Sequence, residues 1–308
     1  MLERTTYRGW SNAYRISNGT VDLIVLADVG PRIIWYGFTG QDNLLHEVPE
    51  HAGLTGGNEF RLYGGHRLWV SPEVERTYFP DNLPVAVSQQ GNAVHFKAPV
   101  ESVSPGTNLL KELTVELEPA GSGVKLTHRV TNCDRQPTEL APWAPTMMRA
   151  GGRGILPMPA KAAMDNDHLQ PVSQLVLWSY TDFSDPRWKV GADYVQLSQN
   201  SKPAGRFQEQ MTGIYNPAGW VAYFRQGTLF LKRAAVVKGA RYPDLGCNLE
   251  TFTNPDFIEV ETLGPLVELK PGENAIHVET WSLFRNVPAG EDEAWIRSAI
   301  LPLVQSSE

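Results

Sequence analysis

The residues between Leu62 and Glu73 bring several kinds of reactive or ligand-binding side chain into one short stretch. Two adjacent glycines are followed at once by His66, Arg67 and Trp69, and the stretch closes with the Glu73 carboxylate. A guanidinium donates hydrogen bonds to hydroxyl oxygens, while an indole face packs against the apolar C–H face of a sugar ring. The pattern therefore favours a site for a polyhydroxylated ligand. The alternative is a Gly-Gly turn with an arginine and a tryptophan stacked at its edge.

A pair of glutamates is the second candidate for chemistry. In an extended Phe257–Leu263 segment, Glu259 and Glu261 point to the same face, about 6–7 Å apart along the strand. Like charges at that separation, beside apolar neighbours, raise the pKa of at least one carboxyl toward the range useful for general acid or base catalysis. We assign the catalytic role to Glu261, because the turn beginning at Thr262 leaves its carboxyl open to a cleft. The alternative is an ordinary solvent-facing strand.

Among the seven histidines, His66 is the best candidate because it alone lies between a glycine pair and an Arg-Leu-Trp run. His95, His128 and His277 lie inside predicted strands, where a packed or solvent-facing imidazole is the simpler interpretation. No His-x-His, Cys-x-x-Cys or clustered aspartate spacing predicts a metal site. Nucleophile-elbow, phosphate-loop and dinucleotide motifs do not occur either, so we expect neither a metal nor another cofactor.

Composition narrows the partners and the compartment. The 308 residues include 27 basic and 34 acidic side chains, a net charge of −7, with no basic run that could follow a phosphate backbone. We therefore expect neither nucleic acid nor an anionic membrane as a partner. No stretch has the apolar length of a signal peptide or a bilayer span, so we expect a cytoplasmic protein. In that compartment Cys133 and Cys247 are expected to be free thiols.

Apolar residues alternate with polar ones along much of the chain, and this period of two predicts strands. Leu110–Glu118 and Gly123–Asn132 show it most clearly, and the short turn between them predicts neighbouring antiparallel strands. Further strands are predicted at Thr20–Ala27, Arg32–Tyr36, Asn92–Lys97, Pro137–Met148, Tyr194–Leu197, Trp220–Arg225, Thr228–Val237, Asn248–Thr253, Phe257–Leu263 and Ala275–Leu283. Only Glu291–Val304 is predicted to be helical. A dozen or more short strands with one terminal helix indicate an all-β protein, which we expect to form a single domain over residues 1–308.

Two irregular stretches are predicted to form walls of the site. Residues 40–81 are rich in Gly, Pro and Asn and contain the His66 motif, and a loop region of that length in a compact domain is usually functional. Trp178–Trp188 is polar, aromatic and turn-forming, and it is the second candidate for a wall.

Four stretches resemble, in the right order, motifs of the aldose 1-epimerase (galactose mutarotase-like) superfamily. They are the hairpin Val25–Phe38, the glycine-pair segment Tyr63–Trp69, the Val130–Leu140 strand, and the Phe257–Thr262 strand with the Val267–Glu273 turn and the closing strand that follow it. The glycine-pair signature is similar to that of a bacterial branch of the superfamily. The resemblance implies a β-supersandwich of antiparallel sheets with a sugar-sized groove lined by residues 58–73 and the Glu261 strand.

The resemblance also implies catalytic roles. In that superfamily a glutamate base acts on the anomeric hydroxyl and a histidine acid acts on the ring oxygen. By resemblance Glu261 takes the base position, but where the family has its histidine this chain reads Ala141-Pro-Trp-Ala-Pro-Thr-Met147. Either His66 or Arg67 then supplies the acid, or the protein is not a mutarotase of the usual kind.

We therefore expect a sugar ligand, either a small molecule or an oligosaccharide, and chemistry at or near its anomeric centre. The catalytic residues are predicted to be Glu261 and His66. The predicted substrate-binding residues are Arg32, Arg67, Trp69, Glu73, Trp143 and Glu259. Two alternatives stay open: a glycoside hydrolase or lyase that uses Glu261 with Glu73 or Glu259, and a non-catalytic carbohydrate-binding protein. The sequence does not determine the oligomeric state.

Overall fold

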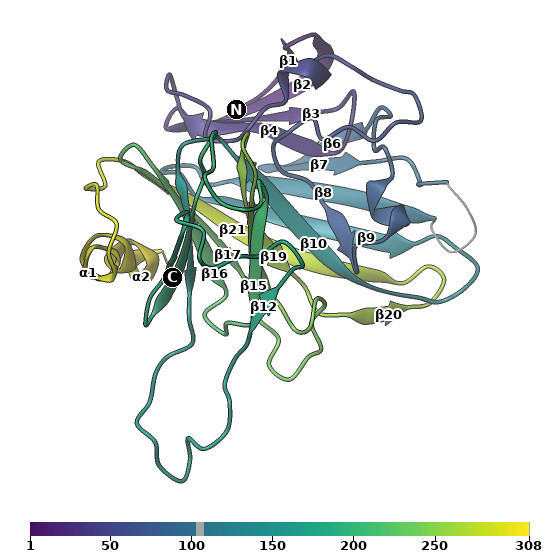
Figure 1. Cartoon of the computed structure of the whole chain (residues 1–308). Helices are drawn as coiled ribbons and strands as arrows, with labels where there is room; N and C mark the ends of the chain where they lie inside the picture. Colours follow the sequence, from purple (N-terminus) through teal and green to yellow (C-terminus); the bar gives the residue numbers. More distant parts are fainter. Residues whose placement is uncertain (103–107, 308) are drawn as a thin grey trace.

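The computed structural model describes residues 1–102 and 108–307, whose strands form three antiparallel sheets (Figure 1). The all-β prediction is confirmed. The first sheet runs in chain order through β1 (Leu2–Tyr7), β2 (Trp10–Ser17), β3 (Val21–Leu26) and β4 (Arg32–Phe38). In Figure 1 these purple strands lie at the top of the view, at one end of the two larger sheets.

The second sheet carries the candidate site. Its order is β12 (Leu175–Leu177), β15 (Gln210–Ile214), β18 (Leu249–Thr253), β19 (Ile258–Leu263), β10 (Thr138–Met148) and β20 (Val267–Leu269). The short β5 (Trp69–Ser71) also pairs with β10. Strand β10 is buried along almost its whole length, which explains its nearly continuous apolar sequence.

The third sheet backs the second. Its order is β13 (Trp188–Val190), β14 (Tyr194–Ser198), β11 (Arg153–Pro157), β16 (Trp220–Arg225), β17 (Thr228–Ala234), β21 (Asn274–Phe284), β9 (Val124–Asn132), β8 (Leu109–Leu117), β7 (Ala93–Lys97) and β6 (Ala86–Gln90). As predicted, β8 and β9 pair antiparallel, and burial alternates residue by residue along both strands. One apolar core cluster joins the three sheets, with Leu23 from the first, Val260 from the second and Trp281 from the third.

The predicted C-terminal helix is also present. It consists of α1 (Glu293–Trp295), a wider π-type turn over Ile296–Ile300, and α2 (Leu301–Ser306). The Asp292 side chain caps its start by accepting the Trp295 N–H, 2.8 Å away. The wide turn ends two residues before Pro302, whose ring would clash with the carbonyl group four residues earlier in a regular α-helix. Within the described residues, no helix combines the length and apolar character needed to cross a bilayer.

Candidate active site

The paired strands β10 and β19 separate two buried polar clusters, one on each face. In their register Thr146 lies opposite Val260, and Pro145 lies opposite Glu261. Val260 belongs to the apolar core, so the Thr146 side chain also points inward, between the second and third sheets. Because side chains alternate along a strand, Glu261 points to the opposite, outer face.

The glycine pair decides which side chains of its loop reach each face. Gly64 and Gly65 have φ angles of 102° and 73°, in the left-handed region that favours glycine. A Cβ on Gly65 would lie 2.1 Å from the Ile33 carbonyl oxygen, so no other residue fits. This close approach lets His66 bridge to Ile33 on one side and to Thr146 on the other, with its ring on the inner face.

His66 belongs to an inner polar cluster, which we define as His66, His128, Lys232, His277 and Glu279 with Thr146 and Thr262. The His66 Nδ1 lies 2.9 Å from Thr146 Oγ1, and its Nε2 lies 3.1 Å from His128 Nε2. Burial lowers the pKa of His66 well below its usual value, so the ring is neutral. His66 and Glu261 were predicted to act at one site. In the structure they lie on opposite faces of the sheet, His66 on the inner face and Glu261 on the outer.

An ion pair balances the charge of the inner polar cluster. Lys232 Nζ lies 2.9 Å from Glu279 Oε1 and donates to the Ala144 carbonyl oxygen and to Thr146 Oγ1. Burial alone would raise the pKa of Glu279, but Lys232 and the cluster's imidazoles hold it well below its usual range. Ligand-type atoms of His66, His128 and Glu279 lie within 4.8 Å of one another. Since the ammonium already neutralises this carboxylate, we interpret the cluster as a structural network rather than a metal centre.

Three glutamates form the outer carboxyl cluster: Glu250 on β18, with Glu259 and Glu261 on β19. Glu250 lies directly opposite Glu261 in the strand pairing, and their exposed fractions are 1% and 0%. The Trp143 indole N–H donates to Glu261 Oε2 at 2.5 Å. Both oxygens of Glu250, Oε1 of Glu259 and Oε1 of Glu261 are buried without a hydrogen-bond partner. Buried carboxyl oxygens without partners are costly, which makes them markers of a ligand site.

Burial raises the pKa of all three carboxyls, and the charges of neighbouring glutamates add to the rise. Burial, and after it the charge of Glu261, raises the pKa of Glu250 well above its usual value. For Glu261 burial and Glu259 raise the pKa well above its usual value, while the Trp143 N–H opposes the rise. Burial raises the pKa of Glu259 to about 7, and the nearby Arg67 works against that shift. Such shifts are what acid and base catalysts need near neutral pH.

Aromatic rings and one guanidinium line the same face. Trp69 and Trp143 are paired across β5 and β10, with ring centroids 5.1 Å apart. Phe60 packs on Trp69 at 5.7 Å, and the Arg67 guanidinium lies 3.5 Å from the centre of a Trp69 ring. Burial lowers the pKa of Arg67 to about 10, so it stays a cation. Arg67 Nε and Trp69 Nε1 are buried donors without a partner.

Two tyrosines lie at the margin of the outer carboxyl cluster. The Tyr78 hydroxyl donates to the exposed Glu73 carboxylate, and Tyr78 packs 5.5 Å from Trp69. Tyr180 packs 6.5 Å from Phe252 on β18. Its pKa is raised by burial and then by the charges of Glu261, Glu73 and Glu250.

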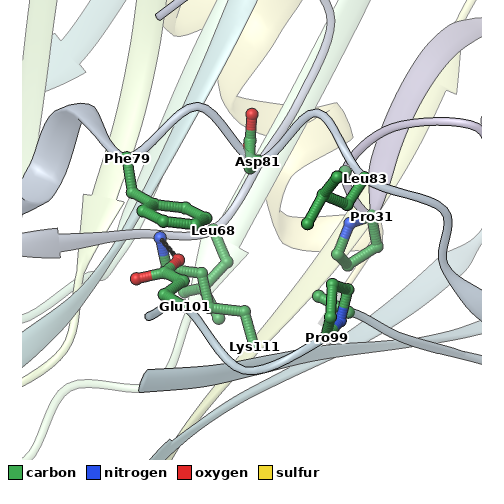
Figure 2. Close-up of a pocket in the computed structure, with 10 residues that line it drawn as sticks. Pro31, Leu68, Phe79, Asp81, Leu83, Pro99, Glu101 and Lys111 are labelled. Carbon is green, nitrogen blue, oxygen red and sulfur yellow. Dashed lines mark ion pairs between the residues drawn. The ribbon is translucent and has the colours of Figure 1, made fainter. Parts of the chain in front are cut away.

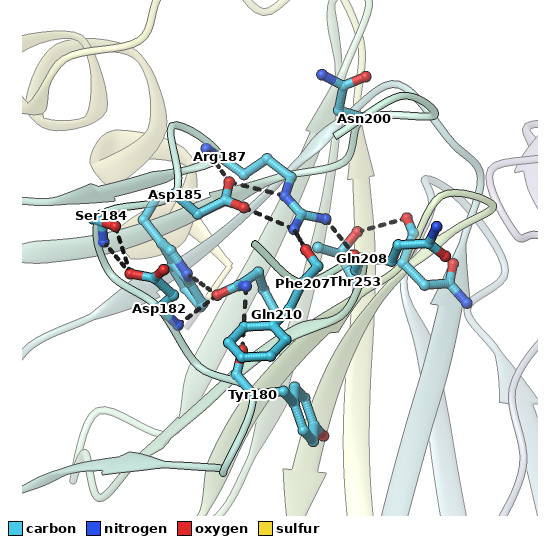
Figure 3. Close-up of polar contacts among 12 residues, drawn as sticks. Tyr180, Asp182, Ser184, Asp185, Arg187, Asn200, Phe207, Gln208, Gln210 and Thr253 are labelled. Atoms are coloured by element: carbon cyan, nitrogen blue, oxygen red, sulfur yellow. Dashed lines mark hydrogen bonds and ion pairs between the residues drawn. The ribbon is translucent and has the colours of Figure 1, made fainter. Parts of the chain in front are cut away.

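A network of hydrogen bonds holds the Trp178–Trp188 stretch, which was predicted as a wall of the site. Arg187 donates to both oxygens of Asp185, at 3.0 and 2.9 Å, and to the carbonyl oxygens of Phe207 and Gln208 (Figure 3). The Gln210 side chain accepts the Asp182 N–H at 2.8 Å and donates to the Tyr180 carbonyl oxygen at 3.2 Å. This network fixes the loop that carries Tyr180.

Arg32, predicted to bind substrate, instead holds the glycine-pair loop. Its guanidinium donates to the carbonyl oxygens of Leu62 and Gly64 and forms an ion pair with Asp81 at 3.2 Å. Asp81 in turn lies on the rim of a small cleft with Pro31, Phe79 and Leu83 (Figure 2). The buried ion pair of Glu101 and Lys111, at 2.6 Å, forms part of this cleft's wall. The cleft shares no lining residue with the outer carboxyl cluster.

Glu250 is the site residue that the sequence interpretation missed. The strand Asn248–Thr253 was predicted, but its glutamate was not singled out. A short turn joins β18 to β19 with Thr253 opposite Ile258, and this register carries Glu250 to Glu261. Counting the same number of residues away from the Asn-Pro-Asp turn along each strand pairs Glu250 with Glu261, so the sequence does contain a signal for this pair.

Solved structures similar to this chain identify its fold. A candidate aldose 1-epimerase from Klebsiella pneumoniae superposes with a TM-score of 0.62 at 13% identity, covering 99% of this chain and 87% of that one. A galactose mutarotase-like protein from Lactobacillus casei superposes with a TM-score of 0.56 at 12% identity, covering 89% and 100%. The Slr1438 protein from Synechocystis superposes with a TM-score of 0.59 at 11% identity, covering 92% of this chain and 98% of that one. No family model and no curated protein sequence matches the chain.

This chain has the galactose mutarotase-like fold. The resemblance seen in the four sequence motifs is thus confirmed for the architecture of antiparallel sheets. At identities of 11–13% the likeness concerns the fold alone. On this galactose mutarotase-like scaffold, the chemistry must be argued from the outer carboxyl cluster and the rings around it.

Proposed function

We propose that the protein binds a sugar on the outer face of β18 and β19 and acts at its anomeric centre, with Glu261 as the general base. The observation that carries this proposal is the environment of Glu261. Its carboxyl is fully buried, takes one indole N–H from Trp143, and keeps its other oxygen without a partner. A ligand hydroxyl would complete that oxygen's hydrogen bonding.

The donors and acceptors of the site complement a polyol. The unpartnered carboxyl oxygens accept hydrogen bonds, whereas Arg67 Nε and Trp69 Nε1 donate them. A sugar hydroxyl does both, so it can satisfy both kinds of atom. The faces of Trp69 and Trp143 supply apolar surface for the C–H groups of the ring. The solved structures of similar fold include proteins described as galactose mutarotase-like or as candidate aldose 1-epimerases, which adds support.

Glu261 would begin the reaction by taking the proton of the anomeric hydroxyl. The sugar's C1–O5 bond then breaks as C1=O forms, and O5 takes up a proton from an acid. C1 rotates about its bond to C2, and ring closure reverses the steps to give the other anomer. The raised pKa of Glu261 makes it a stronger base than an exposed carboxylate. The Trp143 N–H limits that rise and orients the carboxylate.

A second candidate is hydrolysis of a glycosidic bond by two carboxyls. Glu259 and Glu261 lie two residues apart on one face of β19, at about 6–7 Å, close to the separation that inverting glycosidases use. In that function one carboxyl protonates the leaving group and the other activates water. A carbohydrate-binding protein without catalysis is the third outcome that the experiment must distinguish.

One set of measurements on the purified protein separates these functions. Exchange between α and β anomers is measured by NMR on glucose, galactose and their 6-phosphates, beside hydrolysis of chromogenic glycosides and a thermal-shift panel of the same sugars. Anomer exchange above the uncatalysed rate supports the proposal, and release of the chromophore supports the glycosidase. Thermal shifts without turnover indicate a binding protein. If no sugar changes either rate or stability, the proposed function is wrong.

A further inference from the structure

The base proposed above needs a partner acid, and the structure places one carboxyl directly across from it. Glu250 and Glu261 are opposed residues of the antiparallel strands β18 and β19. Cβ atoms of such a pair are about 4.5–5.5 Å apart. Both side chains are buried, and three of their four carboxyl oxygens have no hydrogen-bond partner. The fourth is the Glu261 oxygen that accepts the Trp143 N–H.

We propose that Glu250 is the general acid that works with Glu261, an assignment that rests on the proposed function at the same site. In ring opening, the protonated Glu250 carboxyl gives its proton to the ring oxygen O5 while the Glu261 carboxylate takes the proton of the C1 hydroxyl. The C1–O5 bond breaks and the C1=O double bond forms, so no further reactant is needed. In ring closure the same two protons return, and each carboxyl recovers its starting state.

Other groups fit the acid role less well. His66 lies on the inner face with both ring nitrogens near partners from the protein. Arg67 keeps its proton at neutral pH, since its pKa lies at about 10. The charge of Arg67 favours the ionised form of the Glu259 carboxyl. Burial and the charges of Glu261, Asp244 and Glu73 raise the pKa of Glu250 well above its usual value, which favours the protonated form.

Acidic side chains from several elements surround Glu250. Glu261 faces it from β19, Asp244 lies in the segment before β18, and Glu73 follows β5. Tyr180 from the braced loop and Cys247 next to β18 also interact with it. Two carboxyls this close titrate as a unit, so one proton is shared between them over a broad pH range. The reaction requires this singly protonated state.

The experiment compares Glu250→Gln with Glu261→Gln and with Glu268→Gln, an exposed control on β20. Anomer exchange of galactose and glucose is measured by NMR from pH 5 to 9. In the wild type the rate rises with pH as the pair loses its first proton and falls as it loses the second. Glu250→Gln should lower the maximal rate by about a hundredfold, and the falling limb at high pH should disappear. The control should match the wild type.

A stability measurement separates this role from a structural one. Glutamine in place of a buried carboxyl removes a group that is costly to ionise, so Glu250→Gln should melt about 2–4 °C higher at pH 8. A gain of stability with a loss of rate is the result that supports the acid. If Glu250→Gln keeps wild-type exchange and its high-pH limb, Glu250 is not the acid, although the proposed function stands. If the wild type itself accelerates no exchange, the proposed function fails and this inference fails with it.

Discussion

Strands β10 and β19 separate two polar clusters, and the two clusters differ in how their charges are compensated. On the inner face Lys232 pairs with Glu279, and only His128 Nδ1 is buried without a partner among that cluster's described atoms. On the outer face three glutamates keep four oxygens without partners. The pKa of Glu279 is lowered, whereas that of Glu261 is raised.

The difference shows why burial alone does not identify a functional carboxyl. Glu250 and Glu261 are as hidden from solvent as the inner polar cluster. Residues next to each other in sequence face opposite sides of the sheet: His66 the inner face, Arg67 the outer. A network with nearly all its partners in place stabilises one arrangement of the protein. An incomplete one costs free energy that a ligand can recover by supplying the missing hydrogen bonds. The contrast predicts different effects on stability, on rate and on the response to pH.

The inner polar cluster should dominate stability. Lys232→Met keeps most of the side-chain volume but leaves the Glu279 carboxylate buried without its cation. We expect the free energy of unfolding to fall by about 3–5 kcal/mol, measured by urea denaturation at pH 7. Lys270→Met, at an exposed position, is the control and should change it by less than about 0.5 kcal/mol. A loss below about 1 kcal/mol for Lys232→Met would show that the inner network does not hold the sheets together.

The outer carboxyl cluster should dominate rate instead. Glu261→Gln should lower turnover by at least about a hundredfold, equivalent to about 2.7 kcal/mol, with sugar affinity largely kept. Glu259→Gln should change binding or stability more than rate, because the Glu259 carboxyl interacts with the charge of Arg67. Anomer-exchange kinetics and sugar titrations measure both. Equal, small effects from the two substitutions would mean that these glutamates are not catalytic.

The indole of Trp143 should tune the base. Its N–H favours the ionised form of Glu261, so Trp143→Phe should raise that pKa. The ascending limb of the rate profile should then move to higher pH by about one unit, or about 1.4 kcal/mol. Trp220→Phe, in the separate apolar cluster near the C-terminal helix, is the matched control. An unshifted limb would show that the bond does not control the base.

The clusters should also respond oppositely to pH. Burial lowers the pKa of His66 and His128, so the inner polar cluster loses stability as pH falls below about 6.5, where the unfolded histidines take up protons. Burial raises the pKa of Glu259 from 4.5 to about 7, so its contribution is complete below pH 4.5 and is lost as pH rises through 7. The difference in free energy of unfolding between Glu259→Gln and the wild type removes the contribution of the histidines, which both proteins share. The stability gained by this substitution should grow by about 1 kcal/mol between pH 5 and 8, after allowance for screening. A constant difference in urea denaturation would contradict the raised pKa.

Much of the fold could be predicted where one face of a strand is buried and the other is not. In β8 the alternation of Leu113, Val115 and Leu117 reports burial directly. Strands β1 and β2 were missed because their residues are mostly polar, and β11 because Gly154 and Pro157 read as breakers. Strand β15 is buried on both faces and contains Thr and Gly, so no period of two appears.

The candidate site could be predicted only where local alternation determines it. Glu259 and Glu261 share a face of β19 because they are two residues apart, as expected. The side to which His66 turns depends on Ile33 and Thr146, which are distant in sequence, so spacing could not assign it. The same holds for Arg32, whose partners Leu62, Gly64 and Asp81 belong to the loop that it braces. Long-range contacts of this kind leave no periodic signal.

The glycine pair has a consequence for redesigning this protein. Because Gly64 and Gly65 pass against the carbonyl oxygens of His46 and Ile33, the loop is held at one point and the residues after it are assigned to alternate faces. Inserting or deleting a single residue between Gly65 and Trp69 would therefore exchange the two sets: an imidazole would be presented to the ligand, and a guanidinium would be forced into the core. Loop grafts from related proteins should thus keep the distance from the second glycine, even where they change every side chain that follows it.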